Sequence, residues 1–517
     1  MNDALHWLDY VVIILSLLVS LYIGVYFAKR QKDTKNYYAA SGNIPAWAIG
    51  MSILATLISS ITFLAYPGEG YSSNWIRLVQ GLMVPIVLLF LVWFIVPLYR
   101  KVIGLSAYEY FEKRFGFFAR IYGSLGFALM HFSKMGTVFF LLSLAIAKML
   151  GFSTLSVIFI VGIAVIIVTV LGGIEAVIWL DVIQGFLLIG GGIVALLVLL
   201  FTPEGGPAAV WTTAMEAGRI GFGPYDWDFV HLTFWVMAIN GIFYAIQKYG
   251  TDQTIVQRYL TAKSDKEAIR ASLIGVLLSV PVWALFMFIG TALFAYYQLM
   301  PVSIPEGTRP DAIFPLFIMN ELPIGVTGLI LAALIAAAIS SLDSDLNCLS
   351  AIGVEDYYKR FRPQSTDAQQ LNIGRWLVVA SGLGAILVAT FYVYAGNKGV
   401  LSIIFTLYAI FSGGIAGLFL LGLFSRRANK QGLYFGIAAC VLFTGWAVLT
   451  STPIGDNNKI ILDLGNLNYT QHKYMLGVYS HFVLFIVGYL ASLFFPKPEI
   501  DDNLTIYGWI KKRQVQS

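Results

Sequence analysis

Charged side chains are scarce in this chain. Asp, Glu, Lys and Arg make up 12% of its 517 residues, and hydrophobic residues make up 58%, whereas about 25% of an ordinary soluble domain is charged. The hydrophobic residues fall in blocks of about 20, long enough to cross the hydrocarbon layer of a bilayer as helices. A transmembrane β-barrel would show short alternating segments instead. The composition predicts an all-α membrane protein and excludes a soluble one.

Cysteine and histidine are also rare. The two cysteines, Cys348 and Cys440, both lie in apolar blocks, so no disulfide framework is indicated. The five histidines are scattered and show no HExxH spacing, which disfavours a zinc enzyme. We expect no enzymatic activity and no metal other than sodium. The net charge of +5 comes from basic residues in short loops, so a nucleic-acid partner is not expected either.

The apolar blocks predict thirteen transmembrane spans. The longest connections, near 202–232 and 299–322, are too short for a soluble domain, so residues 1–517 are expected to form a single transmembrane domain. The predicted spans cover roughly 8–28, 44–66, 78–98, 118–149, 154–171, 177–201, 233–251, 269–298, 323–352, 373–395, 401–424, 432–450 and 472–495.

The distribution of lysine and arginine orients these spans. Basic residues concentrate in every second loop, for example at 29–35 and 359–362, and short cytoplasmic loops are enriched in Lys and Arg. Asp3 and Asp9 precede the apolar block that begins near Val12, where a signal peptide would carry basic residues. We expect a multi-pass protein of the cell's inner (plasma) membrane, with its N-terminus outside and its C-terminus in the cytoplasm.

Two predicted spans are interrupted by polar residues or glycine. The second contains Ala-Thr-Leu-Ile-Ser-Ser-Ile-Thr at 55–62, and the seventh contains Asn240-Gly241 and a polar stretch at 247–250. Broken backbone inside a membrane is tolerated where it lines a cavity or is buried in protein. The five-span spacing favours a five-plus-five inverted repeat. The core repeats would cover about 44–201 and 233–424, with one helix before them and two after.

The ninth span carries a dense group of oxygen-bearing side chains. Ser340, Ser341 and Ser344 lie one to two helical turns after Ala337, with Asp343 among them. Hydroxyl and carbonyl oxygens on one helix face suit sodium, a hard cation. The alternative interpretation is a tight helix–helix contact made by small residues.

Two further charged residues fall within predicted spans. Asp181 lies near the start of the sixth span and Lys134 near the middle of the fourth. Such residues need a cation, a carboxylate or a cavity. Asp181 either binds a cation or reaches the interface. Lys134 either contacts an anionic or hydroxyl-rich substrate or pairs with a membrane aspartate.

Four motifs in this order resemble those of the sodium:solute symporters. They are GGIEAVIWLDVIQG at 172–185, DQTIVQRYLTAKS at 252–264, ISSLDS at 339–344 and FLLGLFSRRAN at 419–429. Members of this family carry sugars, proline, sialic acid, iodide, vitamins or monocarboxylates. The resemblance covers nearly the whole chain. It implies a leucine-transporter-like fold, and the thirteen-helix form of the family agrees with the predicted count.

The resemblance also implies two sodium sites. The common site would use the carbonyl groups of Ala55, Ile58 and Ala337 and the hydroxyls of Ser340 and Ser341. A second sodium, which only some members bind, would lie near Asp181, Ser340 and Ser344. Asp343 replaces a serine of the sialic-acid transporters and would add a carboxylate to this second site. Whether one or two sodium ions bind stays open.

The implied substrate pocket lies between the broken helices. Its residues would be Ser59, Ser60, Thr62, Gln80 and Lys134, the last replacing an arginine of the sialic-acid transporters. Ala245, Lys248 and Phe405 align with polar residues of the galactose-type transporters, which disfavours a galactose-like pocket. Arg77 replaces an aromatic residue of the sialic-acid type.

The sequence therefore predicts sodium-coupled symport of a small organic solute into the cell by alternating access, with a sugar or sugar acid favoured. The alternatives are uptake of a monocarboxylate, vitamin or amino acid, a sodium-dependent sensor, or a channel. A sensor would need an output domain, and only about 20 residues follow Pro496. A channel would need a filter motif. The expected partners are sodium, the solute and the lipid bilayer.

Overall fold

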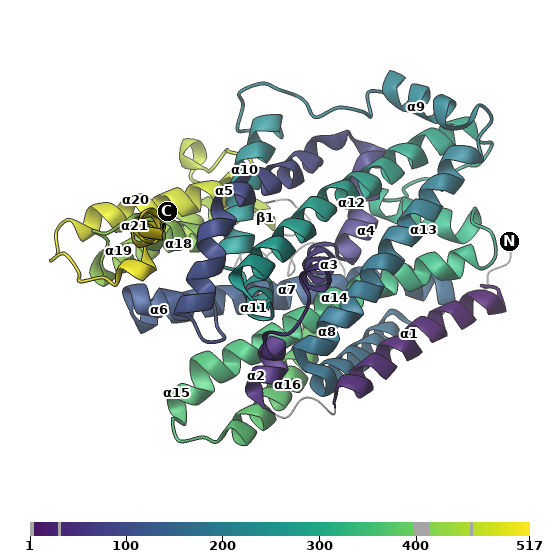
Figure 1. Ribbon diagram of the computed structural model, residues 1–517. Helices are drawn as coiled ribbons and strands as arrows, with labels where there is room; N and C mark the ends of the chain where they lie inside the picture. The colour runs from purple at the N-terminus through teal and green to yellow at the C-terminus, as the bar shows by residue number, and fades with distance from the viewer. Residues whose placement is uncertain (1–4, 29–32, 396–412, 455–458, 517) are drawn as a thin grey trace.

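The structure of the protein is a computed structural model that describes residues 5–28, 33–395, 413–454 and 459–516, and these residues are almost entirely helical (Figure 1). One small antiparallel pair, β1 (Pro453–Ile454) with β2 (Lys459–Ile460), is the exception. The helices are α1 (Trp7–Ala28), α2 (Thr34–Ala39), α3 (Ala46–Leu57), α4 (Ser60–Ser72), α5 (Leu78–Val102), α6 (Glu109–Phe115), α7 (Phe117–Leu150), α8 (Thr154–Phe201), α9 (Gly206–Glu216), α10 (Phe234–Gly250), α11 (Gln253–Leu260), α12 (Asp265–Leu299), α13 (Pro310–Asn320), α14 (Val326–Ile352), α15 (Lys359–Phe361), α16 (Asp367–Ala395), α18 (Ile415–Phe424), α19 (Lys430–Ser451), α20 (Lys473–Ser492) and α21 (Ile506–Gln516).

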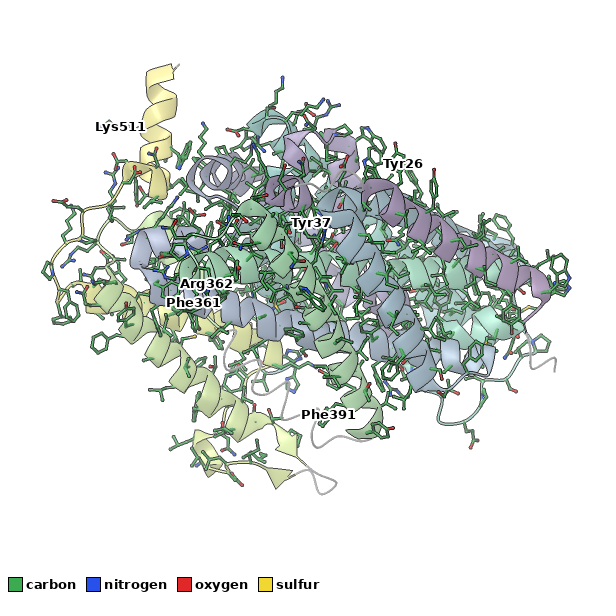
Figure 2. The ribbon with its side chains drawn as sticks, turned by 90° about the horizontal axis from the view of Figure 1, so that it is seen from below. Tyr26, Tyr37, Phe361, Arg362, Phe391 and Lys511 are labelled. Carbon is green, nitrogen blue, oxygen red and sulfur yellow. The ribbon has the colours of Figure 1, made fainter. Side chains whose placement is uncertain are left out.

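The long helices are apolar enough to cross a membrane. Among the described residues, nine pass by length and hydropathy, and the bent pair α3–α4 makes a tenth. Large hydrophobic side chains cover the outside of the bundle, with Phe90 and Leu442 more than 70% exposed. Tyr26 and Phe391 also lie on this outer surface, whereas α21 carries Lys511 away from the bundle (Figure 2). Such a surface is stable only in contact with lipid.

Not every predicted span corresponds to one helix of the structure. The fifth and sixth predicted spans are one element, α8, interrupted at Gly173, whose φ of 57° and ψ of −163° are non-helical. Only glycine adopts this conformation readily. The seventh span is α10, with 17 residues. The eleventh span, 401–424, falls partly outside the described residues. The count of thirteen therefore stays a prediction.

The predicted break in the second span is confirmed. Helices α3 and α4 meet at an angle of 58°, and Ile58 between them is extended, with φ −96° and ψ 112°. Ser59 caps α4 by accepting a hydrogen bond from the Ile61 amide at 3.2 Å. A serine side chain satisfies one of the free amides at a helix start. The break therefore leaves backbone carbonyls at the end of α3 and hydroxyls at the start of α4 inside the protein, without the hydrogen bonds of a continuous helix.

Of the two interruptions predicted in the seventh span, the one at Asn240–Gly241 is wrong, whereas the polar stretch at 247–250 directly precedes the real break. Helix α10 runs unbroken from Phe234 to Gly250, and the chain leaves it only afterwards, where Asp252 caps α11. Gly241 serves a close contact instead, because a Cβ there would lie 2.7 Å from the carbonyl oxygen of Gln80 on α5. The interruption of the second repeat thus lies about three turns further along the chain.

Helix α14 lies at the centre of the bundle. It contacts α8, α1, α16, α7 and α3, and every residue from 330 to 352 is buried. A helix buried on all sides presents its polar residues to protein rather than to solvent or lipid. Its serines and aspartates are therefore interior groups that need partners. Figure 1 shows α1 at one edge of this core and α19 and α20 at the other.

Candidate functional site

Three residues predicted for the common sodium site, Ala55, Ala337 and Ser340, meet where α14 crosses the end of α3. The Ser340 hydroxyl lies 3.2 Å from the Ala55 carbonyl oxygen and 3.2 Å from the Ala337 carbonyl oxygen. Ile58, at the break, and Ser341 are buried. The Ser341 hydroxyl has no hydrogen-bond partner among the described residues. Oxygen atoms from both helices are thus available to a cation at one point.

A second polar cluster lies around Asp181 on α8. Its Oδ2 accepts hydrogen bonds from the Ser52 hydroxyl at 2.5 Å and from the Arg258 guanidinium at 2.8 Å. Arg258 also donates to the Ser344 hydroxyl at 2.7 Å and to the Thr254 carbonyl at 2.6 Å. Asp181 and Arg258 are completely buried. Asp181 is therefore an internal group, and the interpretation as an interfacial aspartate is wrong.

Asp343 adds a second carboxylate to this region. It is fully buried in the middle of α14, and within the described chain neither of its carboxylate oxygens has a hydrogen-bond partner. The Asp181 Oδ1 atom lacks one as well. Two carboxylates face one guanidinium here, and an uncompensated charge at this depth is costly. The geometry favours a further cation.

A cavity of about 330 Å³ opens beside the α3–α4 break. Ser59 and Lys134 line it, as predicted for the substrate pocket. Ser60 and Thr62 are buried nearby on α4, and Gln80 is half-buried on α5, but these three are not among the lining residues. The polar lining consists of Thr56, Ser59, His131, Lys134, Tyr244, Gln247, Lys248 and Asp252.

The ion-pair interpretation of Lys134 is confirmed, and its contact with a solute stays a prediction. Its ammonium lies 3.1 Å from the Asp345 carboxylate, so it pairs with a membrane aspartate. It also lines the cavity, where a solute can reach it. Of the positions aligned with galactose-type transporters, Lys248 lines the cavity, Ala245 is buried, and Phe405 lies outside the described residues. Arg77 pairs with Glu69 at 2.7 Å.

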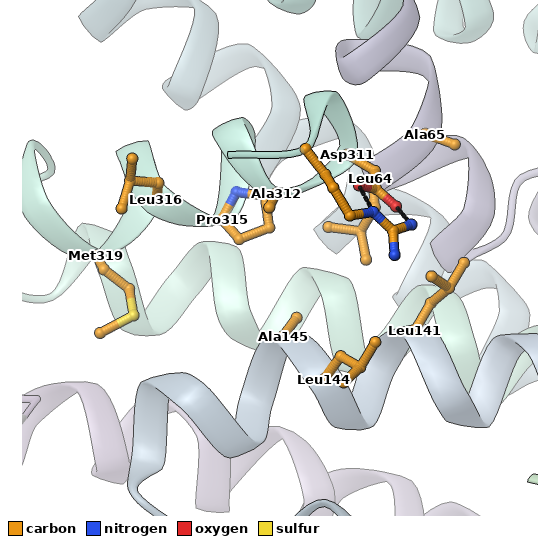
Figure 3. Close-up of a pocket in the computed structure, with 11 residues that line it drawn as sticks. Leu64, Ala65, Leu141, Leu144, Ala145, Asp311, Ala312, Pro315, Leu316 and Met319 are labelled. Atoms are coloured by element: carbon orange, nitrogen blue, oxygen red, sulfur yellow. Dashed lines mark hydrogen bonds and ion pairs between the residues drawn. The ribbon is translucent and has the colours of Figure 1, made fainter. Parts of the chain in front are cut away.

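A second cavity, of about 240 Å³, lies further along the same helices (Figure 3). Leu64 on α4 and Leu141 on α7 contribute to its apolar wall, and the Arg309–Asp311 ion pair stands beside it at 2.6 Å. Leu141 follows Lys134 by seven residues, or roughly 10 Å along a helix. An apolar wall suits passage or closure rather than recognition of a polar solute. The polar cavity is therefore the candidate binding site.

Three comparisons with known proteins bear on this site. The family model described as the sodium:solute symporter family matches residues 37–439. The sodium/sialic acid symporter NanT of Aliivibrio fischeri is 34% identical over 489 residues, covering 94% of this chain and 93% of that protein. The chain belongs to the sodium:solute symporter family. The sodium/sialic acid symporter SiaT of Proteus mirabilis, a second relative, is 35% identical over 440 residues, covering 84% and 88%.

The likeness extends to the fold of a sodium:solute symporter. A solved structure of a sodium-coupled sialic acid symporter, in a substrate-bound outward-open state, matches with a TM-score of 0.86 and 32% identity, covering 95% of this chain and 99% of that one. The protein is therefore a membrane transporter of leucine-transporter-like fold that couples sodium to a small organic solute, and not an enzyme.

Arg258 is the main feature of this symporter that sequence reasoning missed. It lies in the family motif at 252–264, but its place between two predicted spans made it look cytoplasmic. The short helix α11 instead carries it into the core, where it is 0% exposed. The signal was available, because a buried Asp181 requires a cationic partner. Sequence reasoning also gave Asp345 no role, although it is buried in α14, which continues to Ile352.

Proposed function

We propose that this symporter carries a hydroxylated organic acid, of the sugar-acid class, into the cell together with two sodium ions. The observation that carries the proposal is the polar cavity at the α3–α4 break, where the Ser59 hydroxyl and the Lys134 ammonium line the same space. The ammonium of a lysine donates hydrogen bonds to the carboxylate of an acid, and the hydroxyl of a serine forms hydrogen bonds with the hydroxyls of a sugar. The relatives NanT and SiaT, which are named as sodium/sialic acid symporters, support the same class.

The first sodium is proposed to bind the carbonyls of Ala55, Ile58 and Ala337 and the hydroxyls of Ser340 and Ser341. The support is that Ser340 already lies within 3.2 Å of two of these carbonyl oxygens. Its site joins α3 to α14 beside the break. Sodium binding would therefore stabilise the arrangement of the two helices that the cavity needs.

The second sodium is proposed to bind Asp181, Ser340, Asp343 and Ser344. Arg258 pairs with Asp181, and Asp343 has no hydrogen-bond partner among the described residues. With Asp343 ionised, one negative charge would remain. A sodium ion would cancel that charge without a further protein cation. With two sodium ions and one monovalent acid, each cycle would move one net positive charge inward.

The solute is proposed to contact Ser59, Ser60, Thr62, Gln80 and Lys134. Ser60 supports this assignment, because its buried hydroxyl has no hydrogen-bond partner in the part of the chain that the structure describes. Lys134 would share its donors between Asp345 and the solute carboxylate. A lysine is a flexible point charge, so it should accept a wider range of acids than arginine does.

The finer placement in the membrane is also proposed. The transporter is a single domain over residues 1–517 in the plasma membrane, with its N-terminus outside and its C-terminus in the cytoplasm. The support is the clustering of Lys and Arg in alternate loops. Alternating access would expose the cavity first to the outside and then to the cytoplasm.

Uptake into proteoliposomes tests the proposed function. Purified protein is given an inward sodium gradient and a panel of sialic acid, other sugar acids, neutral sugars, amino acids and monocarboxylates. The expected result is accumulation of hydroxylated acids that disappears when potassium replaces sodium. Preferred uptake of a neutral sugar or of an amino acid would refute the assignment of the solute class.

A further inference from the structure

A chain of five charged or ionisable side chains borders the polar cavity. The Asp345 carboxylate lies 2.7 Å from His131 Nδ1 and 3.1 Å from Lys134 Nζ. The Asp252 carboxylate lies 3.3 Å from His131 Nε2 and 2.6 Å from Lys248 Nζ. We call these residues (Lys134, Asp345, His131, Asp252 and Lys248) the two-lysine network. His131 links two aspartates, and a lysine stands at each end.

The carboxylates of the network are buried, whereas its two lysine side chains are partly exposed. The side chains of Asp345 and Asp252 are 1% and 2% exposed, whereas those of Lys134 and Lys248 are 23% and 12% exposed. Both lysines line the cavity of about 330 Å³. They come from different helices, α7 and α10, so they approach the cavity from two sides. A solute entering it meets two ammonium groups.

Each ammonium keeps donor capacity for a ligand. Lysine has three N–H donors and no acceptor. Lys248 uses one on Asp252 at 2.6 Å and one on Thr254 Oγ1 at 3.1 Å, which leaves one. Among the described residues, Lys134 Nζ contacts the two carboxylate oxygens of Asp345, at 3.2 and 3.1 Å. At least one donor on each lysine is thus available to acceptor groups in the cavity.

The charge of the network suits an anion. Carboxylate oxygens only accept hydrogen bonds, so both His131 contacts are hydrogen bonds only when the imidazole carries a proton on each nitrogen. Three positive groups then face two negative ones. With a neutral imidazole the two lysines balance the two aspartates. The net charge is therefore zero or +1 and never negative, and an acidic solute meets no net repulsion.

We propose that Lys248 is a second cationic contact for the solute. The pocket then selects an acid that carries a further acceptor, such as a hydroxyl, a carbonyl or a second carboxylate, away from the carboxylate held by Lys134. Asp252 and Asp345 position the two ammonium groups, and His131 holds the aspartates together. This inference rests on the proposed function in one respect, namely that the solute occupies this cavity.

The test is sialic acid uptake by Lys248→Met in proteoliposomes. A hydrogen bond to a charged group contributes about 1.5–3 kcal/mol, so the half-saturating sialic acid concentration should rise roughly 10- to 100-fold. The half-saturating sodium concentration should change little. Lys248→Arg keeps the charge and should retain most of the affinity.

The double variant Lys248→Met/Asp252→Asn separates solute contact from structure. It replaces the buried ion pair by neutral groups, so it folds even if the single variant leaves Asp252 unpaired and fails. Asparagine also caps a helix as aspartate does, which preserves the start of α11. If the double variant stays weak for sialic acid, Lys248 contacts the solute. Recovery of wild-type affinity would overturn the proposal, since the lysine would then only neutralise Asp252.

Failure of the proposed function is distinguishable from failure of this inference. Wild-type protein that rejects every acid refutes the proposed function, and the same variants are then assayed with the solute that it does carry. If the half-saturating concentration of that solute rises in Lys248→Met and also in Lys248→Met/Asp252→Asn, Lys248 remains assigned as a solute contact. Unchanged values in both would refute it.

Discussion

Replacing Asp343 by asparagine should convert the transporter from electrogenic to electroneutral symport. Asp343 and Asp181 are both fully buried, Arg258 pairs with Asp181, and both Asp343 oxygens lack a hydrogen-bond partner within the described residues. The asparagine removes the excess negative charge, and with it the main attraction for the second sodium. An acid carried with one sodium moves no net charge.

The magnitude follows from the charge count. An unpaired carboxylate in the middle of a span costs about 2.5–3.5 kcal/mol, and a bound sodium offsets at most that amount. Its loss weakens the second sodium on the order of 100-fold. One net charge crossing 100 mV contributes about 2.3 kcal/mol, or roughly 50-fold in accumulation. The variant should lose this entire factor.

The assay compares uptake with and without an inside-negative potential, together with the sodium dependence of the rate. Wild-type protein should show a Hill coefficient near two and stimulation by the potential, and Asp343→Asn should show a Hill coefficient near one and no stimulation. Asp9→Asn is the matched control. Asp9 is buried too, but its carboxylate accepts hydrogen bonds from the Gly325 and Gly328 amides, at 2.9 and 2.7 Å, and it is not one of the residues proposed to bind sodium. Voltage-stimulated uptake that persists in Asp343→Asn would refute the reasoning.

Three further changes test other parts of the molecule. The double variant Ser340→Ala/Ser341→Ala should raise the half-saturating sodium concentration roughly 5- to 100-fold, since two hydroxyl ligands are lost at about 0.5–1.5 kcal/mol each; unchanged sodium dependence in uptake assays would contradict the first site. Lys134→Met should raise the half-saturating solute concentration more than that of sodium, and full recovery in Lys134→Met/Asp345→Asn would reduce the lysine to a structural partner. Gly241→Ala should destabilise the protein by about 1–3 kcal/mol, because a Cβ there would lie 2.7 Å from the α5 backbone. A thermal-shift measurement in detergent tests this loss of stability. An unchanged melting temperature would mean that α5 and α10 move apart without a cost in stability.

The architecture was predictable because span length and hydropathy are local properties of the sequence. The polar residues at 55–62 also identified the first broken helix, because interrupted backbone at membrane depth is tolerated only where it is buried in protein or lines a cavity. The same logic failed at Asn240–Gly241, where glycine permits a close helix contact that only the tertiary structure reveals. A glycine in a span has either meaning, and the sequence alone does not distinguish them.

The group of serines and aspartates on α14 was predictable, and the partners of these residues were not. Ser340 and Ala337 are neighbours on one helix, but the contact with Ala55 joins residues 285 apart in sequence. Asp345, His131 and Asp252 come from three separate elements, and the hydrogen bonds that join them span 214 and 121 residues. Arg258 and Asp252 looked like loop residues because a short helix that folds back into the core has no hydropathy signature. Long-range pairing of buried charges therefore had to come from the structure.

Simultaneous counting of radioactive sodium and labelled sialic acid in the same proteoliposomes tests sodium coupling most directly. Both labels should enter together down a sodium gradient, with two sodium ions for each acid, and both fluxes should fall together in Ser340→Ala/Ser341→Ala at sodium concentrations that saturate the wild-type protein. Solute entry without accompanying sodium, or sodium entry that does not depend on the solute, would contradict the coupling.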